Sequence, residues 1–153
     1  MAVTMSDISK LRKLTGAGMM DCKKALEETN CDMDAAVEII RKKGQAVAAK
    51  REDREASEGC VLSACDGDFA AIVALKCETD FVAKNEKFQN YVADVAAQAL
   101  TTSAADIDAF LAEPWALDTT KTVKEALAAQ IAVIGENMNI RRFAQVTEEN
   151  GFV

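Results

Sequence analysis

The apolar residues of this 153-residue chain first change their spacing close to residue 55. Before that point they recur every three or four residues, which is the spacing of an amphipathic helix. From Gly59 onward they form strand-like runs, and helical spacing returns only near Asn85. The change of pattern predicts two modules, which cover residues 1–54 and residues 55–153.

The first module is expected to hold three short helices between residues 6 and 43, followed by a connecting helix or linker over residues 45–57. Asp32 is expected to cap the third helix, and Gly44 is expected to end it after a turn rich in cations. Helices this short are not stable alone, so the three should pack as a small bundle. Their apolar stripes are Ile8, Leu11 and Leu14, then Met19, Cys22, Ala25 and Leu26, then Met33, Ala36, Val37 and Ile40.

The second module begins with two strand-like runs, residues 59–65 and 69–78, on either side of a turn signal at Asp66-Gly67-Asp68. We expect a hairpin there. Helical patterns follow, and a last strand over residues 139–147 should place one apolar face toward the core. The order predicts β-β-α-α-β, an α+β fold with helices on one face of a small antiparallel sheet. The helical patterns run from Asn85 to Leu100, from Asp106 to Leu111 and from Val123 to Ile134, and the strand face comprises Ile140, Ala144 and Val146.

Side-chain chemistry argues against an enzyme and against a bound cofactor or metal. The chain has no histidine, and its five cysteines form no C-x-x-C pair, so a zinc site is not expected. Without histidine there is no Ser–His or Cys–His nucleophile pair. The glycines before the second helix, Gly16 and Gly18, lack the third glycine of a dinucleotide-binding loop, because Asp21 stands in its place.

The charge is divided unevenly between the two modules. Residues 1–54 carry 11 Lys and Arg against 9 Asp and Glu, whereas residues 55–153 carry 7 against 16. The second module would repel a phosphate backbone, and the basic run Arg41-Lys42-Lys43 has no aromatic residue for base stacking. We therefore expect no nucleic-acid partner. No apolar run is long enough to span a membrane, and no signal peptide is visible, so the cytoplasm is the expected location.

One corner of the second module combines an acid with an aromatic ring. In the stretch LKCETDFVAKNEKF, residues 75–88, Thr79 is a candidate N-cap and Asp80 a first-turn acid. Phe81 lies seven residues before Phe88, and this spacing by itself favours core packing for its ring. The alternative is an exposed aromatic anchor beside a charge, which is typical of binding hot spots.

Three stretches of the sequence resemble bacterial elongation factor Ts, in the order and at the distances of that family. They span nearly the whole chain, and the T-G-A-G-M-M-D-C-K-K-A-L motif within the first is highly specific. The stretches are LRKLTGAGMMDCKKALEETNCDMDAAVEIIRKKG at residues 11–44, CETDFVAKNEKF at 77–88 and IGENMNIRRF at 134–143.

The resemblance implies a guanine nucleotide exchange factor for the GTPase elongation factor Tu, in its GDP-bound and nucleotide-free forms. It implies an N-terminal module similar to ubiquitin-associated domains, and a core in which the T-D-F-V segment displaces Mg²⁺. The implied residues for Mg²⁺ displacement are Thr79, Asp80, Phe81 and Val82. The implied docking residues of the first module are Arg12, Met19, Met20, Lys23 and Lys24.

Many family members carry a second core subdomain, whereas this chain stops just past the first. Two explanations are open, namely that the chain is a naturally short member or that it is truncated. In either case the contacts of the second subdomain are missing or are supplied by a second copy of the chain. Two other functions also remain open. One is an adaptor that binds partners through its first module without exchange activity, and the other is an enzyme with Cys77 as nucleophile near Asp80.

Overall fold

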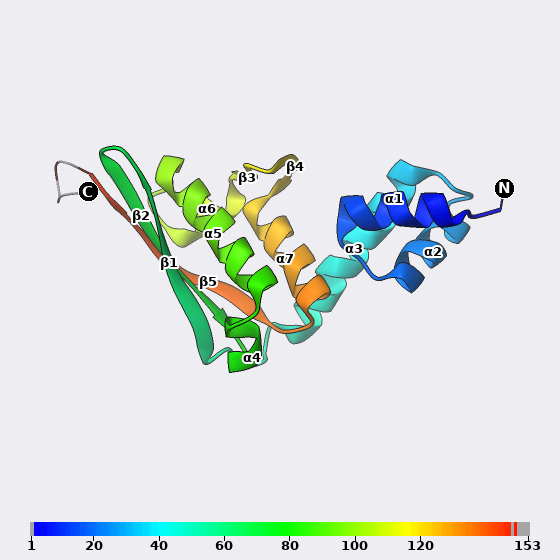
Figure 1. The fold of residues 1–153 in the computed structure, drawn as a ribbon, viewed down its shortest axis with the longest axis horizontal. Coiled ribbons are helices and arrows are strands. Elements are labelled where there is room, and N and C mark those ends of the chain that lie inside the picture. The colour runs from blue at the N-terminus through cyan, green and yellow to red at the C-terminus, as the bar shows by residue number, and fades with distance from the viewer. Residues whose placement is uncertain (1, 148, 150–153) are drawn as a thin grey trace. The chain divides into compact units, whose positions relative to one another are not determined.

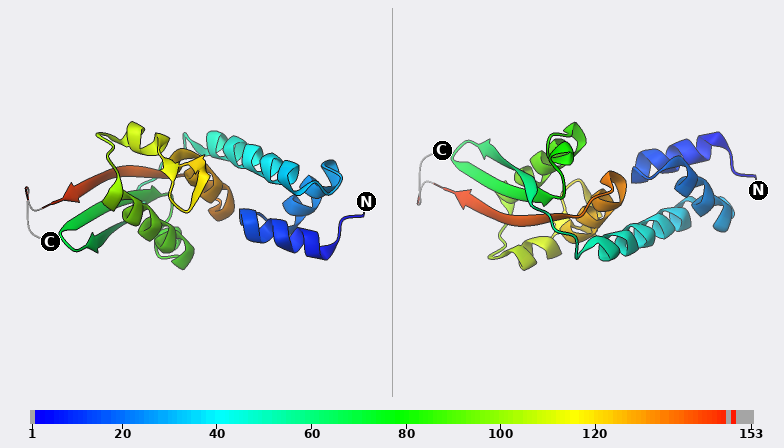
Figure 2. Two further views of the ribbon diagram at one scale, coloured as in Figure 1. Left: turned by 90° about the horizontal axis from the view of Figure 1, so that it is seen from above. Right: turned by 90° about the horizontal axis from the view of Figure 1, so that it is seen from below.

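In the computed structural model, which describes residues 2–147 and 149, the N-terminal part of the chain forms three helices (Figure 2). The Thr4 hydroxyl caps the first helix in a reciprocal pair with Asp7, and the Asp32 carboxylate accepts from the backbone N–H of Ala35. Asp32 therefore caps the third helix as predicted. The helices are α1 (Met5–Thr15), α2 (Met19–Glu28) and α3 (Met33–Arg51).

The small core of these helices is built from the centres of the predicted stripes. Leu14, 65% exposed, and Met19, 47% exposed, lie outside it, so their assignment to core stripes was wrong. Both residues stand at a helix end, Leu14 in the last turn of α1 and Met19 at the first position of α2. The buried residues are Ile8, Leu11, Cys22, Ala25, Leu26 and Ala36.

The third helix does not end at Gly44, and that prediction was wrong. Helix α3 continues for seven residues, to Arg51, and Gly44 is buried within it. A Cβ atom built on Gly44 would lie 3.7 Å from the Cβ of Ala132, in ordinary van der Waals contact. Packing at this buried position offsets the low helix propensity of glycine, which amounts to about 1 kcal/mol relative to alanine.

Two compact units make up the chain. The first extends to Glu52 and includes Ala128–Gly135, and the second runs from Asp53 to Leu127 and resumes at Glu136. Helix α7 (Val123–Ile134) contributes its two halves to different units. The predicted modules, residues 1–54 and 55–153, remain a prediction.

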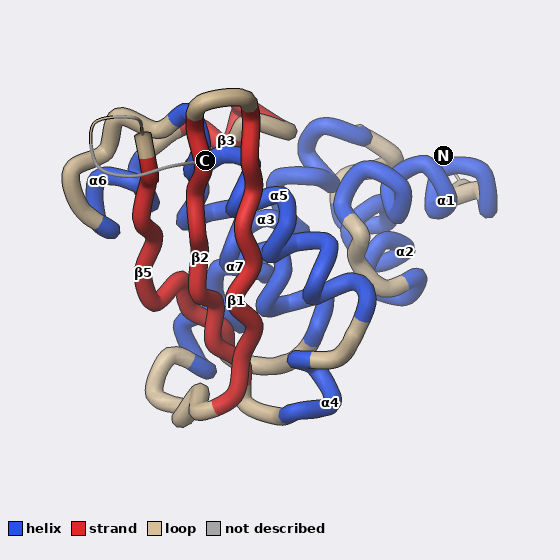
Figure 3. Tube along the Cα trace, turned by 60° about the vertical axis from the view of Figure 1, so that its left-hand side comes forward, coloured by secondary structure: helices blue, strands red, loops and turns tan. Residues whose placement is uncertain are grey.

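The second unit contains a three-stranded antiparallel sheet (Figure 3). The predicted hairpin is confirmed, because Asp66 pairs with Phe69 and leaves a two-residue turn in which Gly67 has a φ of 58°. Such a positive φ is the reason that glycine is favoured there. The strands are β1 (Glu58–Asp66), β2 (Phe69–Cys77) and β5 (Met138–Val146), in the order β1-β2-β5.

Helices cover one face of this sheet, which confirms the predicted α+β fold (Figure 1). Helix α5 (Glu86–Thr101) packs on β1 and β2, and α6 (Ile107–Ala112) packs on β5. On the opposite face, Val61 is 64% exposed and Ile72 is 45% exposed. The core between the layers includes Val73, Leu75, Phe88, Val92, Val95 and Phe110.

The predicted element order missed a second, two-stranded sheet of β3 (Pro114–Trp115) and β4 (Asp118–Thr122). The buried Gln98 amide holds this segment, donating to the carbonyl of Pro114 at 3.0 Å and accepting from the N–H of Ala116 at 2.9 Å. Trp115 is thereby placed with its ring centroid 5.8 Å from that of Tyr91. The Gln98 side chain lies 16 residues before Pro114. The sequence near Pro114 therefore shows no pattern that would predict this sheet.

The predicted apolar face of the last strand was also wrong. Ile140 pairs with Leu75, whereas the neighbouring Ala74 pairs with Arg142, so Arg141 is an extra residue in β5. A bulge of one residue moves all later side chains to the opposite face. Ala144 is consequently exposed, while the Gln145 amide donates to backbone carbonyls at the end of α5.

Candidate functional site

The T-D-F-V segment forms a helix of its own at the end of β2. The Thr79 hydroxyl accepts from the N–H of Val82 at 3.4 Å, so Thr79 is an N-cap as predicted, here of the four-residue helix α4 (Asp80–Ala83). No residue of α4 is buried. Phe81 is 83% exposed, the highest value for a large apolar side chain in the described part of the chain, so its spacing from Phe88 misled about core packing.

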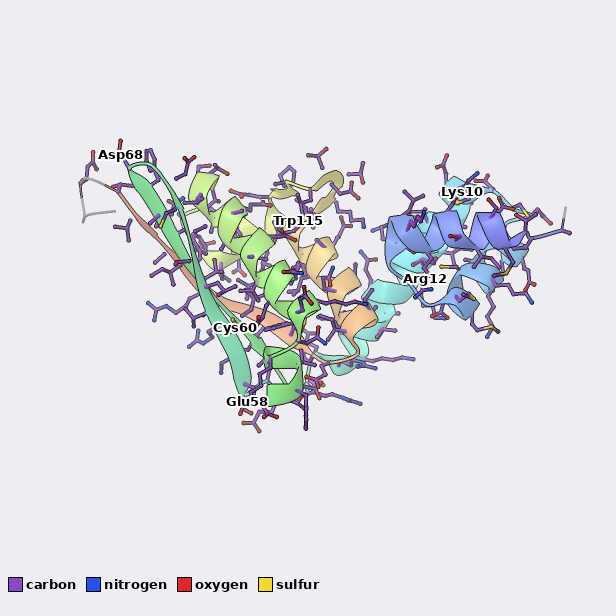
Figure 4. All side chains as sticks on the ribbon, in the orientation of Figure 1. Lys10, Arg12, Glu58, Cys60, Asp68 and Trp115 are labelled. Atoms are coloured by element: carbon purple, nitrogen blue, oxygen red, sulfur yellow. The ribbon has the colours of Figure 1, made fainter. Side chains whose placement is uncertain are left out.

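Thr79 is held from a distant part of the sequence. Its backbone N–H donates to one carboxylate oxygen of Glu136 at 3.0 Å, and its hydroxyl donates to the other at 2.7 Å. The Cys77 thiol contacts the Thr79 carbonyl at 3.3 Å. Figure 4 places Glu58 and Cys60 at the end of β1 beside α4, whereas Asp68 marks the far tip of the hairpin.

The chemistry of this corner is not that of a nucleophile. Burial raises the pKa of the Cys77 thiol to about 11, and the nearby carboxylates of Glu136 and Glu58 add to the increase. The thiol is therefore protonated near neutral pH, and a protonated thiol is a weak nucleophile. Asp80 forms an exposed ion pair with Lys84, in which the carboxylate and ammonium groups are 3.1 Å apart.

The candidate docking residues all lie in the first unit and are all exposed. Arg12 is on the last turn of α1 (Figure 4), and the others are on the first two turns of α2. Among these, the ammonium group of Lys23 lies 3.8 Å from the Glu27 carboxylate on the next turn. The set thus combines two exposed methionine side chains with three cations.

Sequence reasoning missed the residues that hold the corner. Glu136 and Asn137 lie in the stretch 134–143, and Glu78 lies in the stretch 77–88, but no local pattern marks any of the three as functional. The N–H of Asn137 donates to the Glu78 carboxylate at 2.7 Å. Their positions just outside the ends of two adjacent strands are the one signal that could have identified them.

The described residues hold neither a candidate metal site nor a candidate membrane span. Over residues 2–147 and 149, three or more acidic or cysteine side chains never come together as a set of metal ligands. The helices in these residues are all too short or too polar to cross a bilayer.

Comparison with known proteins shows the family of the chain. The elongation factor Ts family model matches residues 78–153, which include the T-D-F-V segment. Elongation factor Ts of Porphyromonas gingivalis is 54% identical over 147 residues, 96% of this chain and 53% of that protein. The Clostridium tetani protein is 50% identical over 99% of this chain, and the Trichlorobacter lovleyi protein is 50% identical over 100% of it. The chain spans about half the length of these curated relatives, and it belongs to the elongation factor Ts family.

Proposed function

We propose that this chain is a guanine nucleotide exchange factor for elongation factor Tu, the GTPase that delivers aminoacyl-tRNA to the ribosome. It accelerates GDP release by displacing Mg²⁺ from the GTPase and performs no bond chemistry of its own. The observation that carries the proposal is the exposed ring of Phe81, presented on a short helix whose N-cap residue, Thr79, is fixed by hydrogen bonds.

Exchange requires differential binding and no acid, base or nucleophile. A protein that binds the nucleotide-free GTPase more tightly than the GDP form must weaken GDP binding by the same factor, because coupling between sites is reciprocal. Mg²⁺ bridges the phosphates to the GTPase, so its displacement removes a large electrostatic contribution to GDP affinity. Thr79, Asp80, Phe81 and Val82 are the residues proposed to act there. The exchange factor is proposed to work in the cytoplasm.

The first unit is proposed to supply binding to the GTPase. Its exposed methionines offer adaptable apolar contacts, and its cations suit an acidic protein surface. Met20→Ala should raise the concentration of chain needed for half-maximal exchange and leave the maximal rate unchanged. Met5→Ala is the matched control, because Met5 is equally exposed, at 66% against 64%, and lies outside the proposed docking set. The docking proposal fails if the two variants behave alike.

A homodimer is proposed as the arrangement that covers the open face of the sheet. The exposed side chains of Val61 and Ile72 support it, since apolar patches on a sheet face commonly bind a partner. Sedimentation velocity at rising protein concentration should show a dimer that Val61→Glu disrupts. A monomer at every concentration would contradict the dimer and leave the exchange proposal untouched.

The exchange function is tested by GDP release. Elongation factor Tu loaded with a fluorescent GDP is mixed with excess unlabelled GDP, and the fluorescence decay is followed with and without the chain. We expect the decay rate to rise with chain concentration and to saturate, and to be less stimulated at high Mg²⁺. A folded chain that binds elongation factor Tu without changing the decay rate would overturn the proposal in favour of an adaptor.

A further inference from the structure

We propose that Glu136 is a positioning residue for exchange, and that its carboxylate sets the orientation in which α4 presents Phe81. The inference rests on the proposed function, although the geometry behind it does not. Glu136 lies 57 residues beyond Thr79 in the chain. It belongs neither to α4 nor to the four residues proposed to act on the GTPase.

The corner lies just beyond the ends of two paired strands. Strands β2 and β5 pair as far as Cys77 and Met138. Beyond this pair, backbone-to-backbone hydrogen bonds give way to hydrogen bonds between a carboxylate of each segment and a backbone N–H of the other. The Glu136 carboxylate accepts from the N–H of Thr79, and the Glu78 carboxylate accepts from the N–H of Asn137. Two segments distant in sequence are thus joined by reciprocal carboxylate-to-backbone hydrogen bonds.

The Thr79 hydroxyl has one proton to donate and two lone pairs that can accept hydrogen bonds. Its proton is directed to Glu136 at 2.7 Å. A lone pair is then free for the N–H of Val82 at 3.4 Å. Glu136 therefore fixes the rotation of the hydroxyl that caps α4, and a continuous path of hydrogen bonds runs from its carboxylate into the helix.

Helix α4 is held at its two ends by different contacts. A helix of four residues is far below the length at which a helix is stable alone, and none of its residues is buried. Two of its residues, Val82 and Ala83, are half-buried, and the Gln89 amide donates to the Ala83 carbonyl at 3.2 Å. The hydrogen bonds at Thr79 are therefore the anchor of its start, where Phe81 lies. The anchor itself is well supported, because Asn137, beside Glu136, is buried and its amide donates to the carbonyl of Arg54 at 2.7 Å.

Loss of the Glu136 carboxylate should release this anchor without removing any group from the partner-facing surface. Phe81 would then be presented in several orientations, of which only a fraction is competent. The apparent affinity of the competent form falls in proportion to that fraction. Hydrogen bonds to a charged group typically contribute enough that their loss lowers exchange efficiency by about tenfold or more.

The experiment compares Glu136→Ala, Glu136→Gln and Glu125→Ala in the GDP-release assay. Glu125 is the matched control, since its carboxylate accepts from the N–H of Thr122 at 3.0 Å in a second Thr–Glu pair, at the start of α7. We expect Glu136→Ala to lose exchange efficiency, Glu136→Gln to lose less because one acceptor oxygen remains, and Glu125→Ala to keep it. Equal losses in Glu136→Ala and Glu125→Ala would overturn the inference.

A double-mutant cycle separates positioning from general destabilisation. If Glu136 acts through Phe81, Glu136→Ala should lower exchange in the wild-type background and have little further effect in a Phe81→Ala background. Independent effects that multiply would contradict the inference. Should Glu136→Ala fail to fold, the near-isosteric Glu136→Gln takes its place in the same cycle.

A measurement on the free chain distinguishes failure of this inference from failure of the proposed function. Backbone ¹⁵N relaxation should show residues 80–83 as ordered in the wild type and more mobile in Glu136→Ala, with α5 unchanged. If the wild-type chain does not stimulate GDP release but α4 loosens, the function is wrong and the structural role of Glu136 stands. If the chain stimulates release and neither α4 order nor rate responds to Glu136→Ala, the inference is wrong.

Discussion

Phe81 and Phe88 are identical side chains seven residues apart, and they lie in opposite environments. Phe81 is on α4 with its ring in solvent, whereas Phe88 is on the first turn of α5 and fully buried. Both helices begin at a side-chain cap, Thr79 for α4 and Asn85 for α5. The start signals are therefore alike, and the difference lies in what each helix packs against.

The two helices are held by different forces. Helix α5 buries seven residues over its 16, most of them apolar, and such burial is the main source of folding stability. Helix α4 buries none fully and is held by hydrogen bonds at both ends, between Glu136 and Thr79 at its start and between Gln89 and Ala83 at its end. The comparison indicates that α5 carries stability while α4 presents a side chain to a partner.

The largest effect is expected for Phe88→Ala. Removing a fully buried phenyl ring leaves a cavity between α5 and the sheet, and such changes lower the free energy of unfolding by about 3–5 kcal/mol. Urea denaturation followed by circular dichroism measures it. Phe81→Ala, seven residues earlier, is the control, and equal losses of stability in the two variants would break the comparison.

Phe81→Ala should affect function and leave stability nearly unchanged. Exposed positions usually change the free energy of unfolding by less than about 0.5 kcal/mol, whereas truncation of an aromatic hot spot lowers partner affinity by about tenfold or more. Melting temperature and GDP-release rate are measured on one preparation. A large fall in melting temperature with an intact rate per folded molecule would return Phe81 to a structural role.

Asn85→Ala should have a smaller effect, on stability alone. The Asn85 side chain accepts from the N–H of Lys87 at 2.9 Å at the start of α5, and loss of such a cap lowers the free energy of unfolding by about 1 kcal/mol. The measurement is urea denaturation beside the GDP-release assay. A variant that keeps its stability but loses exchange would show that the Asn85 cap contributes to the presentation of Phe81 and not to stability alone.

Tyr91→Phe should change stability least. The Tyr91 hydroxyl is buried in α5, and no hydrogen-bond partner for it occurs in the described residues. Replacing it should be neutral, or stabilising by up to about 1 kcal/mol, because an unsatisfied polar group is removed. Burial also raises the pKa of Tyr91 above its ordinary value, with Asp94 contributing.

This shift gives Tyr91 a pH signature with a definite sign. Below the unfolded pKa, about 10, both states are protonated and the contribution of Tyr91 is constant. Above it, only the unfolded state loses its proton, so the stability of the wild type falls as pH rises. The Tyr91→Phe variant should lose less stability over the same range, as urea titrations at several pH values would measure. Identical curves would mean that the hydroxyl ionises equally in both states.

Local chemistry in the sequence determined where several elements begin and turn. The cap at Asp32, the glycine turn at Gly67 and the cap at Thr79 are all where the sequence predicts them. Each signal depends on groups within about three residues of one another, so it acts in the same way whatever the rest of the chain does. The α+β arrangement follows from these elements and their apolar faces.

Burial and register were decided by contacts between distant segments. Helix α3 passes through Gly44 because that position is packed, the face of β5 changes because Arg141 is an extra residue beside β2, and Phe81 stays outside although its spacing from Phe88 suits a core. The same holds for the candidate site. Its motif is visible in the sequence, but the carboxylate of Glu136 that holds Thr79 approaches from 57 residues away, and no local pattern encodes a contact that only the pairing of β2 with β5 creates.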